Sequence, residues 1–354
     1  APKPPYCTSI IGGFDGLNIL DKNAGRMDDK ACSTAAGGGA NSSFVSPSLS
    51  LNTAGVAKNN STIQAYRTAA GILTDSFISN INILAIPGIR EPLVSNRAAR
   101  LTKDYSMAIY LMDIENYDDS SNRLFDDSTV RPSVRKTKEQ FESRAIDNNY
   151  VGVYFPDVII EDPVGRHINS PSSIAALGAL GYNDKVGYPW FAPAGFNRGA
   201  LDFVRNVDVR LTKGDRDDLY DARINPIATF PRQGFVIFGQ KTLQINKSAL
   251  DRVNVRRMLL EVKRIVSDIA AKIIFEQNTP ATRARFVAQV TPQLATIKAQ
   301  QGIDQFKVVM DSSNNTSLDN EQNRLNGRII LVPTRAVEFI SMDFIITNSG
   351  VSFE

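Results

Sequence analysis

Histidine, cysteine and tryptophan are all scarce in this chain of 354 residues. It has one histidine, two cysteines and one tryptophan. A zinc site of the usual kind is excluded, because such sites need several Cys and His ligands. Cys7 and Cys32 are too few for a disulfide framework, so we expect two free thiols and a reducing compartment. His167 would have to serve in any Ser–His–Asp or Cys–His arrangement.

Long apolar runs and an excess of either charge are also missing. No run reaches the roughly 20 residues of a membrane-spanning helix, and no signal peptide is visible. The 40 Lys and Arg nearly balance the 37 Asp and Glu, for a net charge of +3. Nucleic-acid binders usually show a clustered basic excess, so we expect no contact with nucleic acid and no membrane insertion. The linker-like start, APKPP, leads us to expect a fragment of a longer protein.

Motifs for catalysis or cofactor binding are not found. His167 lies in EDPVGRHINSPSS with Asp162 nearby and serines downstream, an order used by one class of serine hydrolases. There is no GxSxG, and a lone histidine in a loop is more often incidental, so a hydrolase using His167 is kept only as an alternative. GGFDG lacks the rest of a phosphate-binding loop. The acidic stretch 113–127 lacks EF-hand spacing. We therefore expect no enzyme activity, no metal and no cofactor.

After residue 62 the chain alternates between helical and strand patterns. Residues 1–62, with the GGFDG turn and a Gly/Ser/Asn-rich loop, are predicted to be irregular. Apolar residues recur at helical spacing over 63–77. An apolar run at 81–88, a helical stretch at 93–105 and a second apolar run at 106–114 then predict a β-α-β unit. Neither run has a polar face, which is typical of a parallel sheet covered by helices.

Residues 63–246 are predicted to form an α/β domain, with a mixed or mainly parallel sheet flanked by helices. Within it, residues 114–148 are charged and poor in aliphatic side chains, which indicates a long connection or insertion. A further strand at 149–163 and a short helix at PSSIAALGALG follow, and GYPWFAPAG is predicted to be a loop.

Residues 247–354 are predicted to form an α+β domain of two helices and three strands. One apolar stripe marks the first, long helix: Val255, Met258, Leu259, Val262, Ile265, Val266, Ile269 and Ile273. Thr279 and Pro280 fit an N-cap and the first position of the second helix. Pro292 is expected to kink or break that helix. Strands are predicted at 305–311, 326–333 and 336–346.

Basic side chains on both of these helices suggest a partner. On the first, Arg257 and Arg264 each have an acidic residue four positions later, as in pairs on a solvated face. The second carries Arg283 and Arg285, with no acidic residue anywhere in 281–300. Unpaired positive charge of this kind favours an acidic partner.

Three consecutive segments resemble the tail sheath proteins of contractile bacteriophages: NYVGVYFPDVIIEDPVG, INSPSSIAALGALGYND and GYPWFAPAGFNRGAL. The family pattern is a strand with Tyr-x-Pro, a Pro-Ser start to a short helix, then Trp-x-x-Pro-Ala-Gly and a glycine. The matching positions are 154–156, 171–172, Trp190, 193–195 and Gly199. NPIATFPRQGFVIFGQKTL, NVRRMLLEVKRIV, NTPATRARF and IILVPTRAVEFISMDFIITNSG are similar as well, although Gln240 and Lys241 depart from the commonest form. Each motif alone is weak, and the shared order carries the resemblance.

The resemblance implies a structural protein of the large-phage type. Its core would have the subtilisin-like fold of the sheath family, without the catalytic activity of subtilisin. It implies many copies stacked in rings around an inner tail tube, which contract to drive the tube through the host envelope for genome delivery. Partners would be other copies of the chain, the tube protein, the baseplate and the tail terminator. The location would be the virion tail, assembled in the host cytoplasm. A pyocin or a type VI secretion-like machine is the nearest alternative.

The resemblance and the residue patterns together give three sets of candidate residues. Four residues are expected to shape a loop that is packed in the core or also sets a contact between subunits: Trp190, Pro193, Gly195 and Gly199. Four are expected to face an acidic tube: Arg283, Arg285, Arg257 and Arg264. The C-terminal run is expected to link subunits by adding a strand to a neighbour's sheet, through Val337, Phe339, Ile340, Met342, Phe344, Ile346, Val351 and Phe353.

Overall fold

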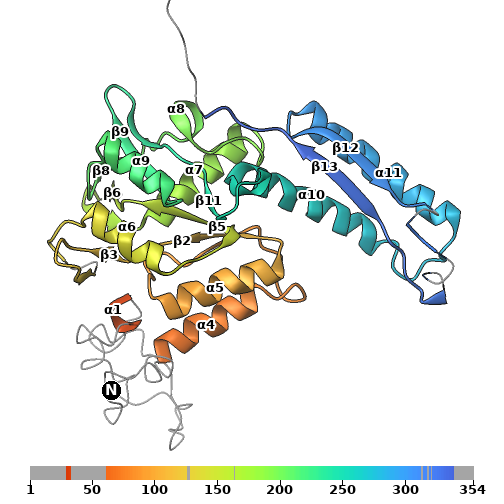
Figure 1. Cartoon of the computed structure of the whole chain (residues 1–354), viewed down its shortest axis with the longest axis horizontal. Helices are drawn as coiled ribbons and strands as arrows, with labels where there is room; N and C mark the ends of the chain where they lie inside the picture. The colour runs from red at the N-terminus through yellow and green to blue at the C-terminus, as the bar shows by residue number, and fades with distance from the viewer. Residues whose placement is uncertain are drawn as a thin grey trace, which may run out of the picture.

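The computed structural model describes residues 29–32, 61–125, 128–162, 164–311, 314–316, 319 and 321–338. In Figure 1, helices surround a central sheet, and a second, elongated part made of two long helices and a hairpin projects from this sheet domain. No helix among the described residues is long and apolar enough to cross a membrane.

The central sheet has six strands and is mainly parallel where it is most buried. Its order is β1-β2-β5-β9-β10, with β11 paired to β5. The strands are β1 (Ile83–Ala85), β2 (Ile109–Met112), β5 (Asn148–Phe155), β9 (Asn225–Phe230), β10 (Gly234–Ile237) and β11 (Thr242–Leu243). The pairs β1–β2, β2–β5 and β5–β9 are parallel, whereas β9–β10 and β5–β11 are antiparallel. The prediction of a mixed or mainly parallel sheet is confirmed.

Alternate residues of these strands enter two cores, one on each face of the sheet. On β2, Tyr110 and Met112 pack into the first core and Leu111 into the second. The first face is covered by α5 (Pro92–Tyr105), α6 (Val134–Ser143) and α9 (Lys213–Asp221), with α4 (Ser61–Leu73) packed on α5. The other face is covered by α7 (Ser172–Val186) and by the start of α10 (Val253–Ala271).

Two smaller sheets lie at the rim of this domain. Strands β6 (Val158–Glu161), β7 (His167–Ser170) and β8 (Val204–Val207) form an antiparallel sheet in the order β7-β6-β8. Strands β3 (Asn116–Tyr117) and β4 (Arg123–Leu124) form a short hairpin. The single strand predicted at 149–163 is therefore wrong, because β5 ends before Pro156 and β6 belongs to another sheet. Proline has no N–H to continue a ladder.

The charged segment 114–148 contains more structure than the sequence predicts. It holds β3, β4 and α6, and it connects the parallel strands β2 and β5. On α6 only Thr137 and Phe141 are buried, with Val134 partly buried against the same core, so its apolar pattern is too sparse to be recognised. The segment is a crossover connection that contributes to the core.

The N-terminal region also contains a short helix, α1 (Asp29–Cys32), where the sequence predicts irregular structure. Cys32 is buried and packs with Ile63, Ile89 and Val94. Cys7 and the GGFDG turn lie outside the described residues.

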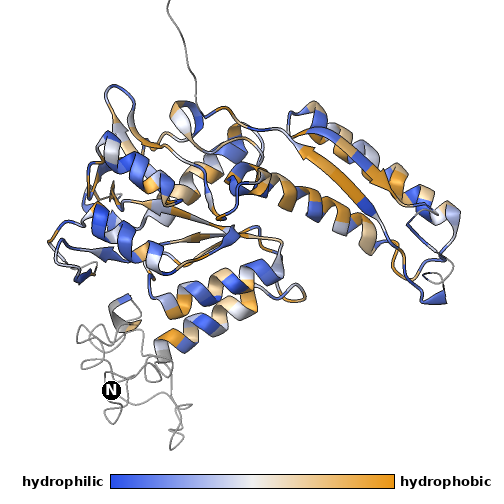
Figure 2. Ribbon diagram, viewed as in Figure 1, coloured by the Kyte–Doolittle hydropathy of each residue, from blue (hydrophilic) through white to orange (hydrophobic). Residues whose placement is uncertain are grey.

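The elongated part is built from α10, α11 (Pro280–Ala299), β12 (Ile303–Val309) and β13 (Arg328–Pro333), with β12 and β13 antiparallel. Figure 2 shows apolar residues along α10 and along most of β13. These two helices and the hairpin enclose a core of their own. All predicted stripe residues of α10 join it except Leu259, while Leu260 packs against the central sheet.

Helix α11 begins as predicted, because the Thr279 side chain accepts a hydrogen bond from the N–H of Thr282 and Pro280 follows it. It does not end at Pro292, which lies inside the continuous helix. Both Pro292 and residue 288, whose carbonyl loses its donor, are exposed, so water can replace the missing bond. The third predicted strand is not formed at 336–338, and residues 339–346 lie outside the described residues.

Candidate functional site

The loop between α7 and α8 (Gly195–Arg198) joins the two parts of the molecule. Trp190 is 8% exposed and belongs to the core formed by α10, α11 and β12. Its Nε1–H donates to the carbonyl of Gln300 at 2.9 Å, and its ring stacks on Tyr188 with the centroids 4.9 Å apart. A Cβ added to Gly302 would lie 3.0 Å from the indole. The side chain of Trp190 therefore inserts from the sheet domain into the core of the elongated part.

Polar contacts fasten this loop to the first turns of α10. Asn254 donates to the carbonyl of Trp190 at 3.2 Å. Arg257 is 5% exposed, forms an ion pair with Asp184 at 2.6 Å and donates to the carbonyl of Pro189. The prediction of a solvated Arg257 is wrong, because the first turns of α10 are buried between the two parts of the molecule. Arg257 holds the joint and is not available to a tube.

The rest of the loop motif has backbone constraints that explain its residue types. Pro193 is buried. Gly195 has a φ of +81°, a conformation that favours glycine. A Cβ at Gly199 would lie 2.8 Å from the Cα of Ala194 and from the carbonyl oxygen of Ile237. No side chain fits at Gly199, so the backbone of the loop requires a glycine there.

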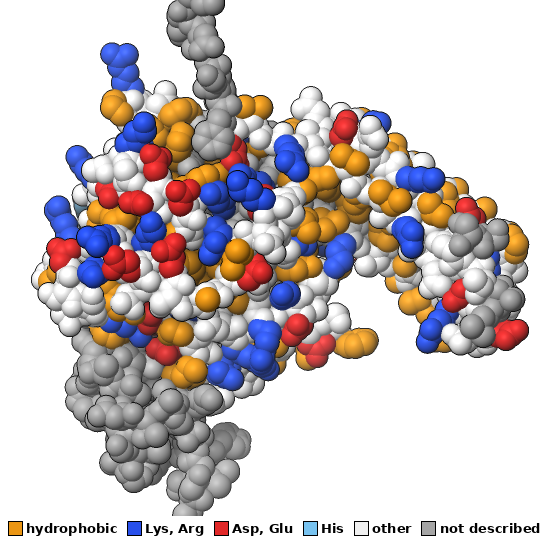
Figure 3. Space-filling view, in the orientation of Figure 1, with side chains coloured by type: hydrophobic (Ala, Val, Ile, Leu, Met, Phe, Trp, Pro, Cys, Tyr) orange, Lys and Arg blue, Asp and Glu red, His pale blue; other side chains and the backbone are white. Residues whose placement is uncertain are grey.

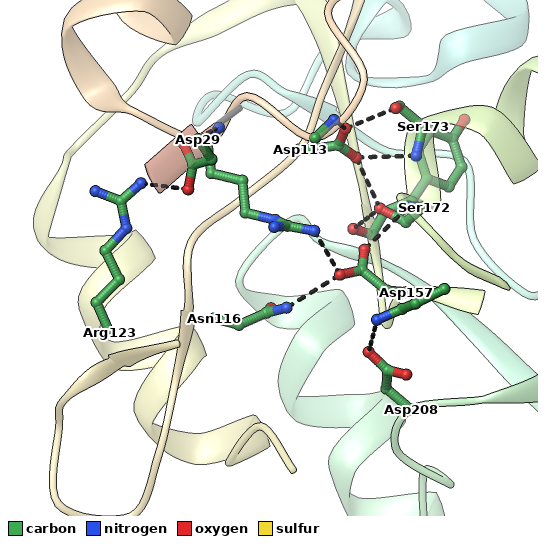
Figure 4. Close-up of polar contacts among 12 residues, drawn as sticks. Asp29, Asp113, Asn116, Arg123, Asp157, Ser172, Ser173 and Asp208 are labelled. Atoms are coloured by element: carbon green, nitrogen blue, oxygen red, sulfur yellow. Dashed lines mark hydrogen bonds and ion pairs between the residues drawn. The ribbon is translucent and has the colours of Figure 1, made fainter. Parts of the chain in front are cut away.

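A buried polar network lies beyond the carboxyl ends of the parallel strands β2 and β5 (Figure 4). Asp113, directly after β2, accepts from the N–H groups of Gly88 and Ser173, both at 2.9 Å. It also accepts from the hydroxyls of Ser172 at 3.2 Å and Ser173 at 2.7 Å. Asp113 thus satisfies donors at the first turn of α7, where a carboxylate is favoured by the helix dipole.

Asp157, which follows β5 and Pro156, supports the same helix end. It accepts from the N–H of Ser172 at 3.0 Å and from Asn116 at 3.1 Å. Its partner Arg90 is only 2% exposed and lies at 2.6 Å. Burial raises the pKa of Asp157 to about 6, against the opposing effect of Arg90. The pair is therefore ionised at neutral pH but sits in a poorly solvated place.

A second part of the network connects α1 to the sheet domain. Asp29 accepts from the backbone N–H groups of Arg90 and Glu91, at 2.9 and 3.1 Å. Arg123 pairs with Asp29 at 2.6 Å, and also with Glu91 and Glu115. These contacts connect α1 with β4 and with the residues just before α5, which are far apart in the sequence.

The network has no catalytic arrangement among the described residues. The hydroxyls of Ser172 and Ser173 donate to Asp113, so neither is activated by a histidine. His167 is exposed on β7, opposite Glu161, and Asp162 is bonded to Arg166. The described residues contain no group of three or more His, Cys, Asp or Glu side chains that could hold a metal ion.

The remaining basic residues of α10 and α11 differ from the sequence prediction. Arg264 pairs at 3.2 Å with Glu261, three positions before it, whereas the predicted partner lies four positions after it. Arg283 is 8% exposed and donates to Asn278 at 2.9 and 3.1 Å. Arg285 forms an ion pair with Glu276. The premise of unpaired charge is thus wrong for Arg285, whose acidic partner lies just before the helix. Arg283 is buried and is hydrogen-bonded to the neutral amide of Asn278, so it is not an exposed charge.

The chain that leaves β13 returns to the sheet domain and is fastened at Glu338. Arg252 donates to its carboxylate from Nε at 2.6 Å and from Nη2 at 2.9 Å. The hydroxyl of Tyr220 donates at 2.6 Å and the amide of Gln240 at 3.2 Å. Burial opposes ionisation, but the hydrogen bonds from Arg252 and Tyr220 lower the pKa of Glu338. We call these four residues the Glu338 clamp.

Of the predicted linking residues, Val337 lies in the described part of the chain. Val337 is 79% exposed beside the clamp. Phe339, Ile340, Met342, Phe344, Ile346, Val351 and Phe353 lie outside the described residues. On the face shown in Figure 3, acidic and basic side chains are mixed over the sheet domain.

Sequence reasoning missed Arg90, Asp113, Asp157 and Glu338. For the two aspartates a signal exists, since each follows an apolar strand, in IYLMD and in YFPD. Carboxyl ends of neighbouring parallel strands meet at one edge of a sheet, so the two could have been placed together. Arg90 and Glu338 lie in segments without a periodic pattern, and nothing local marks them.

Comparison with known proteins finds similarity to tail sheath proteins. No protein-family model matches the chain. The tail sheath protein of Vibrio phage KVP40 is 38% identical over 176 residues, which are 50% of this chain and 26% of that protein. The tail sheath protein of Enterobacteria phage T4 is 31% identical over 210 residues, 59% of this chain and 31% of that protein. This chain therefore matches less than a third of the length of either relative.

Solved structures share the fold. The helical sheath of the anti-feeding prophage in its contracted state superimposes with a TM-score of 0.61 at 20% identity, over 81% of this chain and 74% of that one. The sheath complex of an extracellular contractile injection system, PVC, also in the contracted state, gives a TM-score of 0.60 at 20% identity, over 75% and 71%. In sequence, about half of the chain is thus similar to the tail sheath proteins of phages, and in fold the chain is similar to the sheaths of contractile injection systems.

Proposed function

We propose that this protein is a structural subunit of a contractile phage tail sheath. The observation that carries the proposal is the similarity to phage tail sheath proteins at 31–38% identity. The subunit polymerises with its own copies in rings around the inner tube, in contact with the baseplate and the tail terminator. It contracts to drive the tube through the host envelope for genome delivery. Its place is the virion tail, after assembly in the host cytoplasm.

The joint at Trp190 suits this role. A sheath subunit must keep its fold while its contacts to neighbours change. An indole buried in the second core, together with the ion pair of Arg257 and Asp184, lets the sheet domain and the elongated part move as one body. The energy of contraction is then stored between subunits, where a small difference per copy is multiplied along the polymer.

The protein acts without catalysis in this proposal. The serines that follow His167 serve to hold the start of α7, and the buried carboxylates are engaged by donors of the same chain. The hydrolase alternative would require His167, which is exposed on a rim strand. The fold shared with the anti-feeding prophage favours a second candidate, the sheath of a phage-derived injection machine.

The proposal is tested by electron microscopy of the complete natural protein, produced with its tube protein. Hollow tubes with a helical repeat are expected. A protein that stays monomeric under all conditions that support tube formation would contradict it. Tubes attached to capsids indicate a phage, and free tubes that carry a baseplate but no capsid indicate the injection machine.

The tube-facing surface is proposed to be the exposed side of α11, with Arg264 of α10 as a further contact. Arg285 and Lys298 are exposed on α11, and no acidic residue occurs from 281 to 300. Since exposed charge pairs are weak, the pair of Arg285 with Glu276 can be exchanged for a contact with an acidic tube.

Arg285→Glu is expected to change the free energy of unfolding by less than about 1 kcal/mol, because its ion pair is exposed. It is expected to reduce assembly on the tube severalfold, measured by cosedimentation. Lys103→Glu, an equal charge change on exposed α5, is the control. Arg283→Glu is expected to destabilise the protein by about 2 kcal/mol or more, since it breaks buried hydrogen bonds to Asn278. Normal assembly of the Arg285 variant would exclude this surface.

The linking role of the C-terminal run is also proposed. The hairpin β12–β13 has exposed apolar residues, Ile330 at 49% and Val332 at 45%, which an added strand from a neighbour could cover. Removal of residues 347–354 is expected to leave a cooperative thermal transition and to abolish tubes in electron micrographs. Removing the same number of residues from the Gly/Ser/Asn-rich loop within 33–60 is the control. Tubes of normal length from the C-terminal truncation would place the links elsewhere.

A further inference from the structure

The Glu338 clamp joins the two ends of the elongated part. Arg252 is the residue before α10, where the chain leaves the sheet domain, and Glu338 follows β13, where the chain comes back. The two are 86 positions apart and are connected by two hydrogen bonds of an Arg–carboxylate pair. Such bidentate pairs are among the stronger polar contacts in proteins.

The other members of the clamp come from the sheet domain. Tyr220 lies on α9, and its ring lies under the ammonium group of Lys241, 3.6 Å away. Gln240 is only 3% exposed and precedes β11. Glu338 is thus bound to a rigid surface by three different side chains. A carboxylate with four donors of this kind is strongly oriented.

Between β13 and the clamp the chain has few contacts. The N–H of Thr334 donates to the carbonyl of Gly302 at 3.3 Å. Residues 334–337 are exposed, and Val337 is 79% exposed. A cavity of about 300 Å³ lies beside them, lined in part by Tyr220, Phe238 and Val337. Glu338 is therefore the main attachment of this segment to the sheet domain.

We propose that Glu338 is a positioning residue for assembly, which fixes the point at which the C-terminal run leaves the sheet domain. The proposal rests on the proposed linking role of that run. A run that starts from a fixed point reaches a neighbour's sheet with a higher effective concentration than one that starts from a loose segment.

The clamp also determines which contacts carry a force that a neighbouring subunit applies to the C-terminal run. With Glu338 in place, force from a neighbour passes through Arg252, Tyr220 and Gln240 into the sheet domain. Without it, the same force acts on β13 and opens its ladder with β12 from the end at Pro333, one pair at a time. The clamp therefore protects the hairpin that the proposed added strand needs.

Limited proteolysis of the complete natural protein tests the attachment. Trypsin cleaves after Arg335, which is exposed three residues before Glu338. Glu338→Gln is expected to raise the rate of this cleavage at least about tenfold, because the protease needs a locally opened chain. The new end at Ala336 is followed by mass spectrometry. Glu321→Gln, the same change at an exposed position, is the control and should cleave like the wild type.

A graded variant and an assembly measurement complete the test. Tyr220→Phe removes one donor and is expected to raise cleavage by a smaller factor, which keeps the test valid if Glu338→Gln fails to fold. With an unchanged melting temperature, Glu338→Gln is expected to form fewer and shorter tubes than Glu321→Gln. Equal cleavage rates would overturn the clamp, and faster cleavage with normal tubes would overturn its positioning role. Absence of tubes from the wild type would contradict the proposed function alone, since cleavage does not depend on assembly.

Discussion

Trp190→Ala is expected to lower the free energy of unfolding by about 3–5 kcal/mol, the range for removing a large aromatic side chain from a core. The indole fills space against Gly302 and within the core of α10 and α11, and its N–H satisfies the carbonyl of Gln300. Removal leaves a cavity and an unpaired carbonyl together. Trp190 belongs to the sheet domain in sequence, but its side chain packs in the core of the elongated part. Its removal is therefore expected to weaken the contact between the two parts.

The elongated part is accordingly expected to open before the sheet domain. Hydrogen exchange should show loss of protection in α11 and β12 first, with β2 and β5 still protected. Trp190→Phe retains most of the apolar area without the hydrogen bond and should be less destabilised. Phe77→Ala, at a side chain that is 99% exposed, should have almost no effect. Equal loss of protection in both parts after Trp190→Ala would show that the loop does not act as their joint.

The long helices could be predicted from sequence because their signals are local. The stripe from Val255 to Ile273 and the cap at Thr279 are each contained in a few turns of chain. Helix α6 lacked such a signal, since its only apolar residues against the core are Val134 and Phe141. The same reason explains Pro292: the residue is a helix breaker locally, but an exposed site and tertiary packing of the rest of α11 outweigh its effect.

Partners of charged side chains were the least predictable feature. Helical spacing pairs Arg257 with Glu261, but burial at the joint brings Asp184, 73 positions away, within 2.6 Å. In the same way Glu276 neutralises Arg285 from the turn before its helix. Spacing within one helix assumes that its polar face meets water, and α10 and α11 violate this assumption at the places where they meet the rest of the molecule.

Arg90→Met is expected to show the largest loss of stability at neutral pH and a marked recovery in acid. Its partner Asp157 would be left buried without its counter-ion, which costs about 3–5 kcal/mol. Burial already raises the pKa of Asp157 from 3.8 to about 6, and the loss of Arg90 raises it further. A carboxyl group with a raised pKa takes up a proton on folding. The stability that it contributes is complete below the unfolded value and is lost as the pH rises through the folded value.

The wild type therefore loses this contribution between about pH 4 and pH 6, and the variant continues to lose it above pH 6. The loss of unfolding free energy in the variant, relative to the wild type, is therefore expected to be larger at pH 7.5 than at pH 5. The difference is up to about 1.4 kcal/mol for each unit by which the substitution raises the pKa of Asp157. Urea unfolding at both pH values measures the difference. Arg100→Met, at an exposed position of α5, should show no such pH dependence. Adding Asp157→Asn to Arg90→Met should remove both the unpaired charge and the pH dependence. If Arg90→Met showed the same deficit at pH 5 and pH 7.5, its loss of stability would come from packing and not from the charge of Asp157.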